Sequence, residues 1–427
     1  MSTISNPRRP QQQPRRKSRR RPQEVVVRNI VRTVRVQEYD HIIFITALCL
    51  TGFGLVMVLS AGQFSVMNTP GGIFSLVRMQ AIAAVIGFAG LLIMANGIGS
   101  KKGGRYWFGH HFLADFAFPI YVVTCIGGLV AVLLLGTRVQ GGLRWIQIPA
   151  IGVQFQPSEF AKVGMIIMLA RYIGADRTRA DFDNPFKVGL KRFFISLRGL
   201  LGCVVIIGIP AGLVAAGRNM STVLIMVGIG AAMIFLASRY FFSWLIAGAS
   251  AVGAGVLYLY TRVGVDFRGG RFAAWGDPFS DPLGYGYHAI QSLFAIASGG
   301  FFGLGLGNSN QKMRYLPEAH NDFIFAIIVE ELGLFGASLL LMFFGILVWR
   351  GCLAAIRARS LEGTLMATGI IAMISIQVLI NVGVVTNTLP NTGIPLPFIS
   401  YGGTSLIVML SSVGILLNIS KYPRNRT

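Results

Sequence analysis

Side chains that could do chemistry gather at a few places in this chain, and the first is the segment 315–322. It holds Glu318, His320 and Asp322 directly before an apolar run. Carboxylates and imidazoles are the commonest general acids and bases, so the segment suits proton transfer. Asp322 also suits a structural role, because acidic residues are favoured at the N-terminus of a helix. Either interpretation places these side chains at the mouth of a helix.

The second place is the segment 144–162, where Arg144 is followed by Gln156, Glu159 and Lys162. A proline follows Gln156 and fits the first turn of a helix. Glu159 and Lys162 are three residues apart and can form an ion pair on one helical face. The alternative is that Lys162, together with Arg144, holds a phosphate group of a substrate.

The third place is the segment 393–405, which combines glycines and prolines with hydroxyl side chains such as Ser400 and Thr404. This spacing demands an irregular backbone, which at membrane depth is tolerated only where protein or a cavity covers it. We therefore expect one wall of a site here. Arg78, early in another apolar run, either extends its charge to the membrane surface or forms a second contact for an anion.

Glu330 and Glu331 stand inside an apolar run. A carboxylate at that depth costs several kcal/mol unless it faces protein or a wet cavity. We therefore expect both side chains to face protein or a wet cavity, and a structural role alone does not readily explain two acids inside a span.

These residues stand out because the chain is apolar: of its 427 residues, 53% are hydrophobic and 13% are charged. Soluble globular proteins carry about 25% charged residues, which excludes an ordinary soluble enzyme. Apolar runs of about 20 residues are long enough to cross a membrane. We predict an all-α polytopic membrane protein with ten transmembrane helices, over residues 41–61, 74–96, 112–136, 158–174, 196–217, 220–238, 241–260, 323–349, 363–386 and 401–419.

Lysine and arginine indicate the orientation, because cytoplasmic segments hold the excess of them. Residues 1–39 form a basic tail, with eleven Lys and Arg against one acid up to residue 36. The tail is predicted to be disordered and cytoplasmic, and to be attracted to anionic lipid. Nucleic-acid binding is the sharper interpretation, but no folded module supports it. The short segment 421–427 is predicted to be a second cytoplasmic tail.

The longest connection, 261–321, lies between the seventh and eighth predicted helices on the outer side of the membrane. Long connections usually carry function. This connection holds many charged residues, including Arg271 and Lys312, on the side of the membrane where the orientation rule predicts few charges. Its stretch 287–306 is apolar but interrupted by two glycines, so we predict that it lies in the interface or re-enters the membrane without crossing it.

Two classes of function fit this arrangement. A transporter places ionisable residues near the midplane between repeated halves. An intramembrane enzyme acting on a lipid-linked anionic substrate places a base beside an outer cleft, with cations for the phosphate. The charged residues stand at the mouth, which favours the enzyme.

Four motifs together resemble the SEDS family (shape, elongation, division and sporulation) of integral-membrane peptidoglycan polymerases. They are Arg144-Trp145, QPSEFAK at 156–162, GLGLGNSNQKMRYLPEAHNDFIFAIIVEELG at 303–333 and PLPFISYGGTS at 395–405. The resemblance covers about 40–420 and is closest to the member that acts in cell division; a sporulation paralogue is the alternative. Asn321 stands where the family usually has Thr.

The resemblance implies a glycosyltransferase that polymerises lipid II into β-1,4 glycan strands at the outer face of the bacterial cytoplasmic membrane, at the division septum. Undecaprenyl pyrophosphate is the product released. Asp322 is implied as the essential acid, which would take the proton of the attacking hydroxyl. The cations expected to bind pyrophosphate are Arg78, Arg144, Lys162 and Arg271. The other residues expected at the substrate are Gln156, Glu159, Lys312, Glu318, His320 and Ser400.

The resemblance also implies partners: a class B penicillin-binding protein, which is a single-span transpeptidase, and other division proteins. A divalent cation such as Mg²⁺ or Mn²⁺ is an alternative neutraliser of the pyrophosphate, although no cluster in the sequence marks a metal site. A lipid II flippase is the second function proposed for this family, and it would move the lipid without chain growth.

Overall fold

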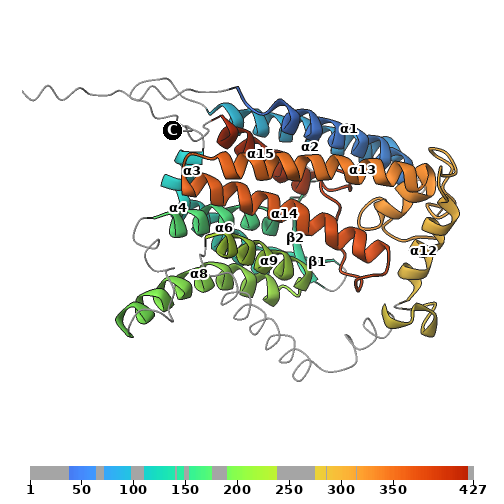
Figure 1. Ribbon diagram of the computed structural model, residues 1–427. Coiled ribbons are helices and arrows are strands. Elements are labelled where there is room, and N and C mark those ends of the chain that lie inside the picture. Colours follow the sequence, from blue (N-terminus) through green and yellow to red (C-terminus); the bar gives the residue numbers. More distant parts are fainter. Residues whose placement is uncertain are drawn as a thin grey trace, which may run out of the picture. The chain divides into compact units, whose positions relative to one another are not determined.

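The computed structural model describes residues 38–63, 72–97, 110–139, 142–148, 153–175, 190–237, 275–284, 286–313 and 315–421. Most of these residues are helical (Figure 1). The α-helices are α1 (His41–Ala61), α2 (Gly72–Asn96), α3 (His110–Asp115), α4 (Ala117–Tyr121), α5 (Gly128–Leu135), α6 (Pro157–Gly174), α8 (Leu190–Ala216), α9 (Met220–Ala237), α12 (Tyr287–Gly299), α13 (Ile324–Arg357), α14 (Leu361–Val385) and α15 (Gly403–Ser420). The other elements are a π-helical turn η1 (Val122–Gly127), a 3-10 turn η2 (Pro278–Ser280) and the strands β1 (Thr137–Val139), β2 (Gly142–Ile148) and β3 (Val153–Phe155).

The helices coincide with the predicted apolar runs wherever those runs fall among the described residues. Seven helical segments in the described part of the chain are long and apolar enough to cross a membrane. The chain is therefore a polytopic helical membrane protein, as predicted. The run 241–260 lies outside the described residues, so the count of ten helices stays a prediction.

The predicted helix over 112–136 is divided into several elements. α3 and α4 are separate helices, and the π-helical turn η1 joins α4 to α5. In the π-helical turn the Thr124 hydroxyl donates to the carbonyl of Ile120 at 2.8 Å. Such a bond competes with the regular helical ladder and explains local widening. The span that remains is Ala117–Leu135.

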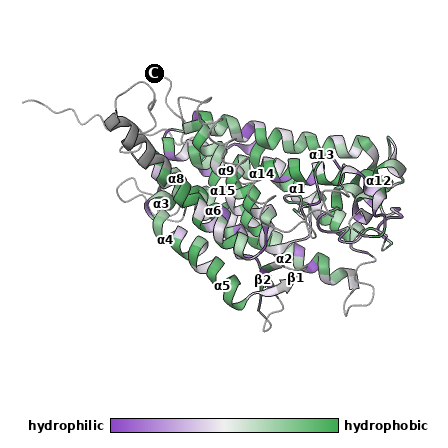
Figure 2. Cartoon of the chain, turned by 90° about the horizontal axis from the view of Figure 1, so that it is seen from below, coloured by the Kyte–Doolittle hydropathy of each residue, from purple (hydrophilic) through white to green (hydrophobic). Residues whose placement is uncertain are grey.

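Local sequence explains where several helices begin. The Asp40 carboxylate accepts from the backbone N–H of Ile42 at 3.1 Å and caps α1. The Ser360 hydroxyl caps α14 by accepting from Gly363, and a proline occupies the first turn of α6. These are the residue types that satisfy or tolerate the free N–H groups of a first turn. Figure 2 shows that the helices are hydrophobic over most of their length, as helices in contact with lipid must be.

The helices α14 and α15 are the best packed. Of the apolar span, 67% is buried inside the protein in α14 and 72% in α15, against 28% in α2 and in α13. α14 packs against α13 and α9, and α15 packs along α2. The segment 386–402, which joins α14 to α15, is thus held between the most rigid parts of the bundle.

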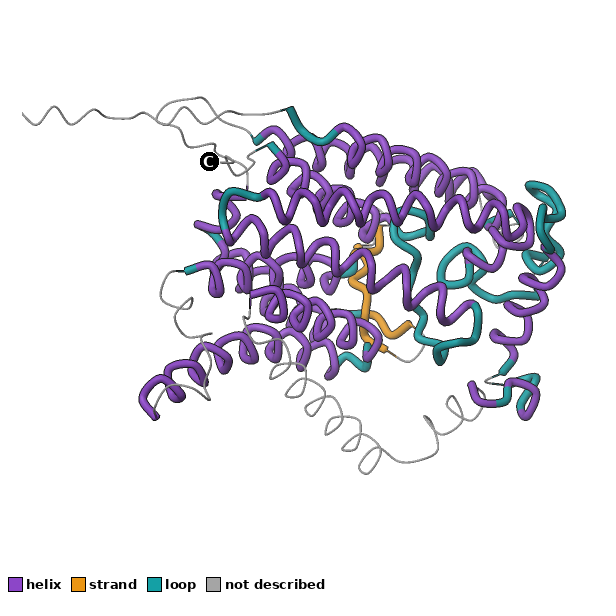
Figure 3. The backbone as a smooth tube through the Cα atoms, in the orientation of Figure 1, coloured by secondary structure: helices purple, strands orange, loops and turns teal. Residues whose placement is uncertain are grey.

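A small antiparallel sheet, with strand order β1-β2-β3, lies among the helices between α5 and α6 (Figure 3). The sequence analysis did not predict it. Alternating apolar and polar residues in β2 and β3 favour strands, and Ile146 pairs with Phe155. The backbone N–H of Leu143 also donates to Gly217 at 3.0 Å, which ties β2 to the turn before α9. The sheet places Arg144 beside the start of α6.

Gly333 interrupts α13 with φ 69° and ψ −175°, a conformation that glycine adopts without strain. The segment 300–305 lies against this break. Leu304 donates to the carbonyl of Glu330 at 2.9 Å and Leu334 donates to that of Gly300 at 3.0 Å. α12 has 13 residues, too few to cross a bilayer. α12 leads into a loop that packs against α13. This agrees with the prediction that 287–306 does not cross the membrane.

Candidate active site

Asp322 lies in a tight turn just before α13. Glu318, with φ 55°, begins this turn, and its carbonyl accepts from the backbone N–H of Asn321 at 3.0 Å. The Asn321 amide also donates to the Glu318 carboxylate at 2.5 Å. The turn therefore fixes both the backbone before Asp322 and the Glu318 carboxylate beside it.

The pKa of the Asp322 carboxyl is raised to about 6, chiefly by burial and also by the charge of Glu318, while the charge of Arg144 acts in the opposite direction. A carboxylate with a raised pKa is a stronger base and is still largely ionised at pH 7. Burial also lowers the pKa of His320, so its imidazole is neutral at that pH. Asp322 is therefore the candidate base of this cluster, and Arg144 is a cation close enough to influence it.

The segment after α14 holds the backbone that leads to Asp322. Tyr401 donates its N–H to the carbonyl of His320 at 3.0 Å. Ser400 donates its hydroxyl to the carbonyl of Asn321 at 2.7 Å and accepts from the N–H of Leu396 at the same distance. The sequence analysis expected Ser400 at the substrate; the structure gives its hydroxyl two backbone partners.

Four of the expected site residues, Arg144, Gln156, Glu159 and Lys162, line one pocket. Glu159 and Lys162 form an ion pair of 2.9 Å between Oε1 and Nζ, and their side chains are 5% and 2% exposed. The ion pair that the spacing allowed is therefore present. The pocket is completed by Asn219, Ser221, Thr222, Ile225, Gln377 and residues 393–395.

Gly393 joins this pocket to Asp322. A side chain at Gly393 would place its Cβ 3.1 Å from Oδ2 of Asp322, and the residue has φ +64°. The missing side chain leaves space directly beside the carboxylate. The pocket and the base therefore share one wall.

Arg78 and Lys312, two other expected residues, do not line this pocket. Arg78 is exposed on α2, Arg271 lies outside the described residues, and Lys312 is 1% exposed. The Lys312 ammonium contacts the Glu331 carboxylate at 2.9 Å. A lysine whose charge is paired in the interior is not available to a phosphate, so the expected substrate contact of Lys312 is corrected to a structural one.

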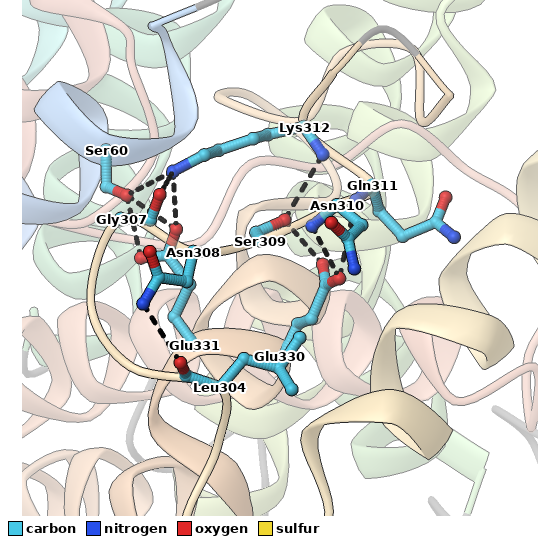
Figure 4. A network of polar contacts seen from close by, with 10 residues as sticks. All are labelled: Ser60, Leu304, Gly307, Asn308, Ser309, Asn310, Gln311, Lys312, Glu330 and Glu331. Atoms are coloured by element: carbon cyan, nitrogen blue, oxygen red, sulfur yellow. Dashed lines mark hydrogen bonds and ion pairs between the residues drawn. The ribbon is translucent and has the colours of Figure 1, made fainter.

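Lys312 belongs to a buried network that joins the loop 300–313 to the helix bundle (Figure 4). Its ammonium also donates to the Ser60 hydroxyl at 3.2 Å and to the carbonyl of Gly307 at 2.6 Å. Ser60 donates to both carboxylate oxygens of Glu331, at 2.6 and 2.7 Å. The network joins the end of α1, the loop and α13.

Glu330 fastens the same loop without a cation. Its carboxylate accepts from the Ser309 hydroxyl at 2.5 Å and from the N–H groups of Asn310 and Gln311 at 2.9 and 3.4 Å (Figure 4). Hydrogen bonds of this kind compensate a buried carboxylate. Glu330 and Glu331 both have 0% exposure, so they face protein, one of the two surroundings expected. Both carboxylates hold the loop, a structural role that the sequence alone did not favour.

Polar residues in the middle of apolar helices are the part of the site that the sequence analysis overlooked. Gln80 on α2 donates to the carbonyl of Ser400 and accepts from Gly402, both at 3.1 Å. Gln377 on α14 is 1% exposed and lines the pocket. A polar side chain inside a span predicts a buried polar partner, and that signal was present in the sequence.

A divalent cation would need oxygen ligands. Among the described residues no group of three or more histidine, cysteine, aspartate or glutamate side chains lies together. Beside the pocket, the charge of Glu318 raises the pKa of the Asp322 carboxyl.

A family model described as "Cell cycle protein", which covers FtsW, RodA and SpoVE, matches residues 40–425. The chain belongs to this family. The matched range includes the pocket, the turn of Asp322 and the loop network.

Two curated relatives match almost the whole chain. The stage V sporulation protein E of Bacillus subtilis is 36% identical over 387 residues, which are 90% of this chain and 98% of the relative. A probable peptidoglycan glycosyltransferase FtsW of Geobacter sp. (strain M18) is 36% identical over 392 residues, 91% of this chain and 99% of the relative. The peptidoglycan glycosyltransferase MrdB of Escherichia coli is 37% identical over 307 residues, 71% of this chain and 78% of the relative.

Solved structures share the fold. A chain from a peptidoglycan synthase complex that coordinates polymerization and crosslinking superposes with a TM-score of 0.69 at 24% identity, covering 90% of this chain and 97% of that one. The rod shape determining protein RodA of Thermus thermophilus superposes with a TM-score of 0.60 at 22% identity, covering 90% and 96%.

Proposed function

We propose that the chain is a peptidoglycan glycosyltransferase that polymerises lipid II. Membership of a family whose curated members include enzymes of that name supports the activity. The observation that carries it is the position of Asp322: a desolvated carboxylate at the mouth of α13, with a raised pKa, beside a pocket that holds Arg144 and Lys162.

The reaction joins the 4-hydroxyl of a GlcNAc unit to the anomeric carbon of a MurNAc unit that carries an α-pyrophosphate. The β-1,4 bond forms with inversion, so the acceptor hydroxyl attacks from the face opposite the leaving group. The Asp322 carboxylate takes the hydroxyl proton as the C–O bond forms, and the electron pair of the broken bond leaves with undecaprenyl pyrophosphate. A base whose pKa lies near the working pH is the efficient choice for this step.

Arg144 is the cation placed to stabilise the departing pyrophosphate. It lines the pocket and influences the Asp322 carboxyl. Preorganised charge near a leaving group stabilises the transition state more than the ground state. Lys162 lines the same pocket but is paired with Glu159, so its role is to hold the pocket wall.

The test is the conversion of purified lipid II into glycan polymer by the chain in detergent. Asp322→Asn should abolish polymer while the variant still melts cooperatively. Polymer at the wild-type rate from that variant would contradict the assignment. Scoring lipid transfer between the leaflets of vesicles in the same preparation separates polymerase from flippase, because a flippase moves lipid II and yields no polymer.

The cellular setting is part of the proposal. The polymerase works at the outer face of the bacterial cytoplasmic membrane, with both termini in the cytoplasm and a class B transpeptidase as partner. The complex in which a similar chain coordinates polymerization and crosslinking supports this kind of partner. We propose a role in division at the septum; complementation of division and of sporulation mutants separates this role from that of a sporulation paralogue.

A further inference from the structure

Asn381, near the end of α14, contacts the backbone of Asp322 itself. Its side-chain amide donates to the carbonyl of Asp322 at 2.8 Å. The carbonyls of the two preceding residues are held by Ser400 and Tyr401, as described above. Three consecutive carbonyls that lead to the base are thus each fixed by a donor from α14 or from the segment that follows it.

The second N–H of the same amide donates to the carbonyl of Ile394 at 2.7 Å. Ile394 follows Gly393, whose missing side chain leaves the space beside Oδ2 of Asp322. We call the space between the Asp322 carboxylate and the backbone of Gly393 and Ile394 the notch. One amide group therefore bonds to the backbone on both sides of the notch. Asn381 is 1% exposed, and hydrogen bonds in such a medium are strong and hold their geometry.

We propose that Asn381 is a positioning residue, which fixes the separation between the Asp322 carboxylate and the wall at Gly393 and Ile394. The proposal rests on the proposed function, in which Asp322 is the base. The attacking hydroxyl must enter this notch and donate to the carboxylate. A notch of fixed width admits it in a single orientation.

The consequence is kinetic. A misplacement of about 1 Å between reacting groups costs on the order of 100-fold in rate. Asn381 is not among the residues that line the pocket of Arg144 and Lys162, so its loss should lower kcat and leave KM for lipid II nearly unchanged. A purely structural residue would lower the amount of folded enzyme and leave the kcat of the folded fraction as it is.

Asn381→Leu removes both donors at nearly constant volume. The matched control is Asn418→Leu on α15, which removes another buried amide: Asn418 is 3% exposed and donates to the carbonyl of Ala95 at 3.1 Å. Both variants are compared by thermal unfolding in detergent and by kcat and KM with lipid II. We expect similar losses of melting temperature, a fall in kcat of about 100-fold for Asn381→Leu, and less than about threefold for Asn418→Leu.

The pH profile supplies a second readout. Among the described residues, Glu318 and Arg144 act on the Asp322 carboxyl through their charges, and His320 stands two residues before it in the chain. A loosened Asp322 becomes more hydrated, so the acidic limb of the kcat/KM profile should move to lower pH in Asn381→Leu and stay in place in Asn418→Leu. Asn381→Ser, which keeps one donor, should lie between the wild type and Asn381→Leu in kcat and serves as the test if the leucine variant does not fold.

Wild-type kcat and an unshifted profile in folded Asn381→Leu, or in Asn381→Ser if only that variant folds, would overturn the positioning role. An equal fall of kcat in Asn381→Leu and Asn418→Leu would do the same. The proposed function fails separately, through an active Asp322→Asn variant.

Discussion

Lys312 and Glu331 form an ion pair of 2.9 Å in which neither side chain has any exposed surface. The pair joins the loop 300–313 to α13. Ser60, at the end of α1, bonds to both partners and so connects α1 to the same network. Lys312 stands ten residues before Asp322 in the chain, and next to it the Leu316 N–H donates to the carbonyl of Gln311 at 2.9 Å, so the pair anchors the segment that leads to the turn of Asp322. Stability and geometry of the site should therefore depend on a contact outside the pocket.

Replacing Lys312 by Met should lower the free energy of unfolding by about 3–5 kcal/mol, because it leaves the buried Glu331 charge without its partner. Removing both charges in Lys312→Met/Glu331→Gln should restore about half of that loss, since no unpaired charge remains. Thermal and denaturant unfolding in detergent measure both. The control is Arg171→Gln: Arg171 pairs with Glu362 at 2.5 Å but is 47% exposed, and a surface pair contributes at most about 1 kcal/mol. A double variant less stable than Lys312→Met would contradict this account.

The pH dependence of activity should follow Asp322. Its pKa is raised to about 6, and a base acts only when ionised. kcat/KM should therefore be flat above about pH 7 and fall about tenfold per pH unit well below pH 6. A limb centred near the ordinary pKa of an aspartate would show that Asp322 is not desolvated in the working enzyme.

The same raised pKa makes Asp322 costly for stability at neutral pH. The folded state holds the proton to higher pH than the unfolded chain, so stability falls as pH rises from about 4 to about 6 and stays lower above that. The neutral variant Asp322→Asn escapes this cost. It should be more stable than the wild type at pH 7.5, by up to about 3 kcal/mol from the shift between 3.8 and about 6, and equally stable at pH 3.5. A variant that is less stable than the wild type at pH 7.5 would speak against a desolvated carboxylate.

Much of the fold followed from apolar runs, because a spanning helix must be long and continuous and lipid tolerates few exceptions. The position of Asp322 at a helix mouth and the ion pair of Glu159 and Lys162 followed from spacing along one element. The contacts of Ser400 and Lys312 did not follow from spacing of this kind. Both depend on which distant segment comes to lie opposite them, which local spacing does not determine.

The small sheet escaped prediction for a related reason. Its strands have three to seven residues, and their pairing is set by the helices on either side. Arg144 was identified as a candidate by type alone. Its place beside the base depends on β2 bonding to the turn at Gly217.

Arg144 lowers the pKa of Asp322 through its charge. In Arg144→Gln the pKa of Asp322 should therefore rise, and the acidic limb of the kcat/KM profile should move to higher pH. The maximal kcat/KM should fall as well, because the leaving pyrophosphate loses a cation that stabilises it. The pH at which kcat/KM falls does not depend on its maximal value, so one measurement of kcat/KM against pH separates the two effects. Arg171→Gln, at a distant ion pair, should leave the limb in place; a limb that does not move in Arg144→Gln would separate Arg144 from the base.

Gly393 should be sensitive to the smallest substitution. A methyl group there would lie 3.1 Å from Oδ2 of Asp322, and φ of +64° disfavours any residue with a Cβ. Gly393→Ala should therefore occupy the space that the attacking hydroxyl needs and lower kcat by at least about 100-fold. Gly383→Ala serves as a control on the same side of the bundle, because its Cβ would meet the flexible end of Leu389 at 2.7 Å rather than the base. Both variants are scored by polymer formed from lipid II per unit of folded protein. Unchanged kcat in folded Gly393→Ala would place the attacking hydroxyl on the other side of the Asp322 carboxylate.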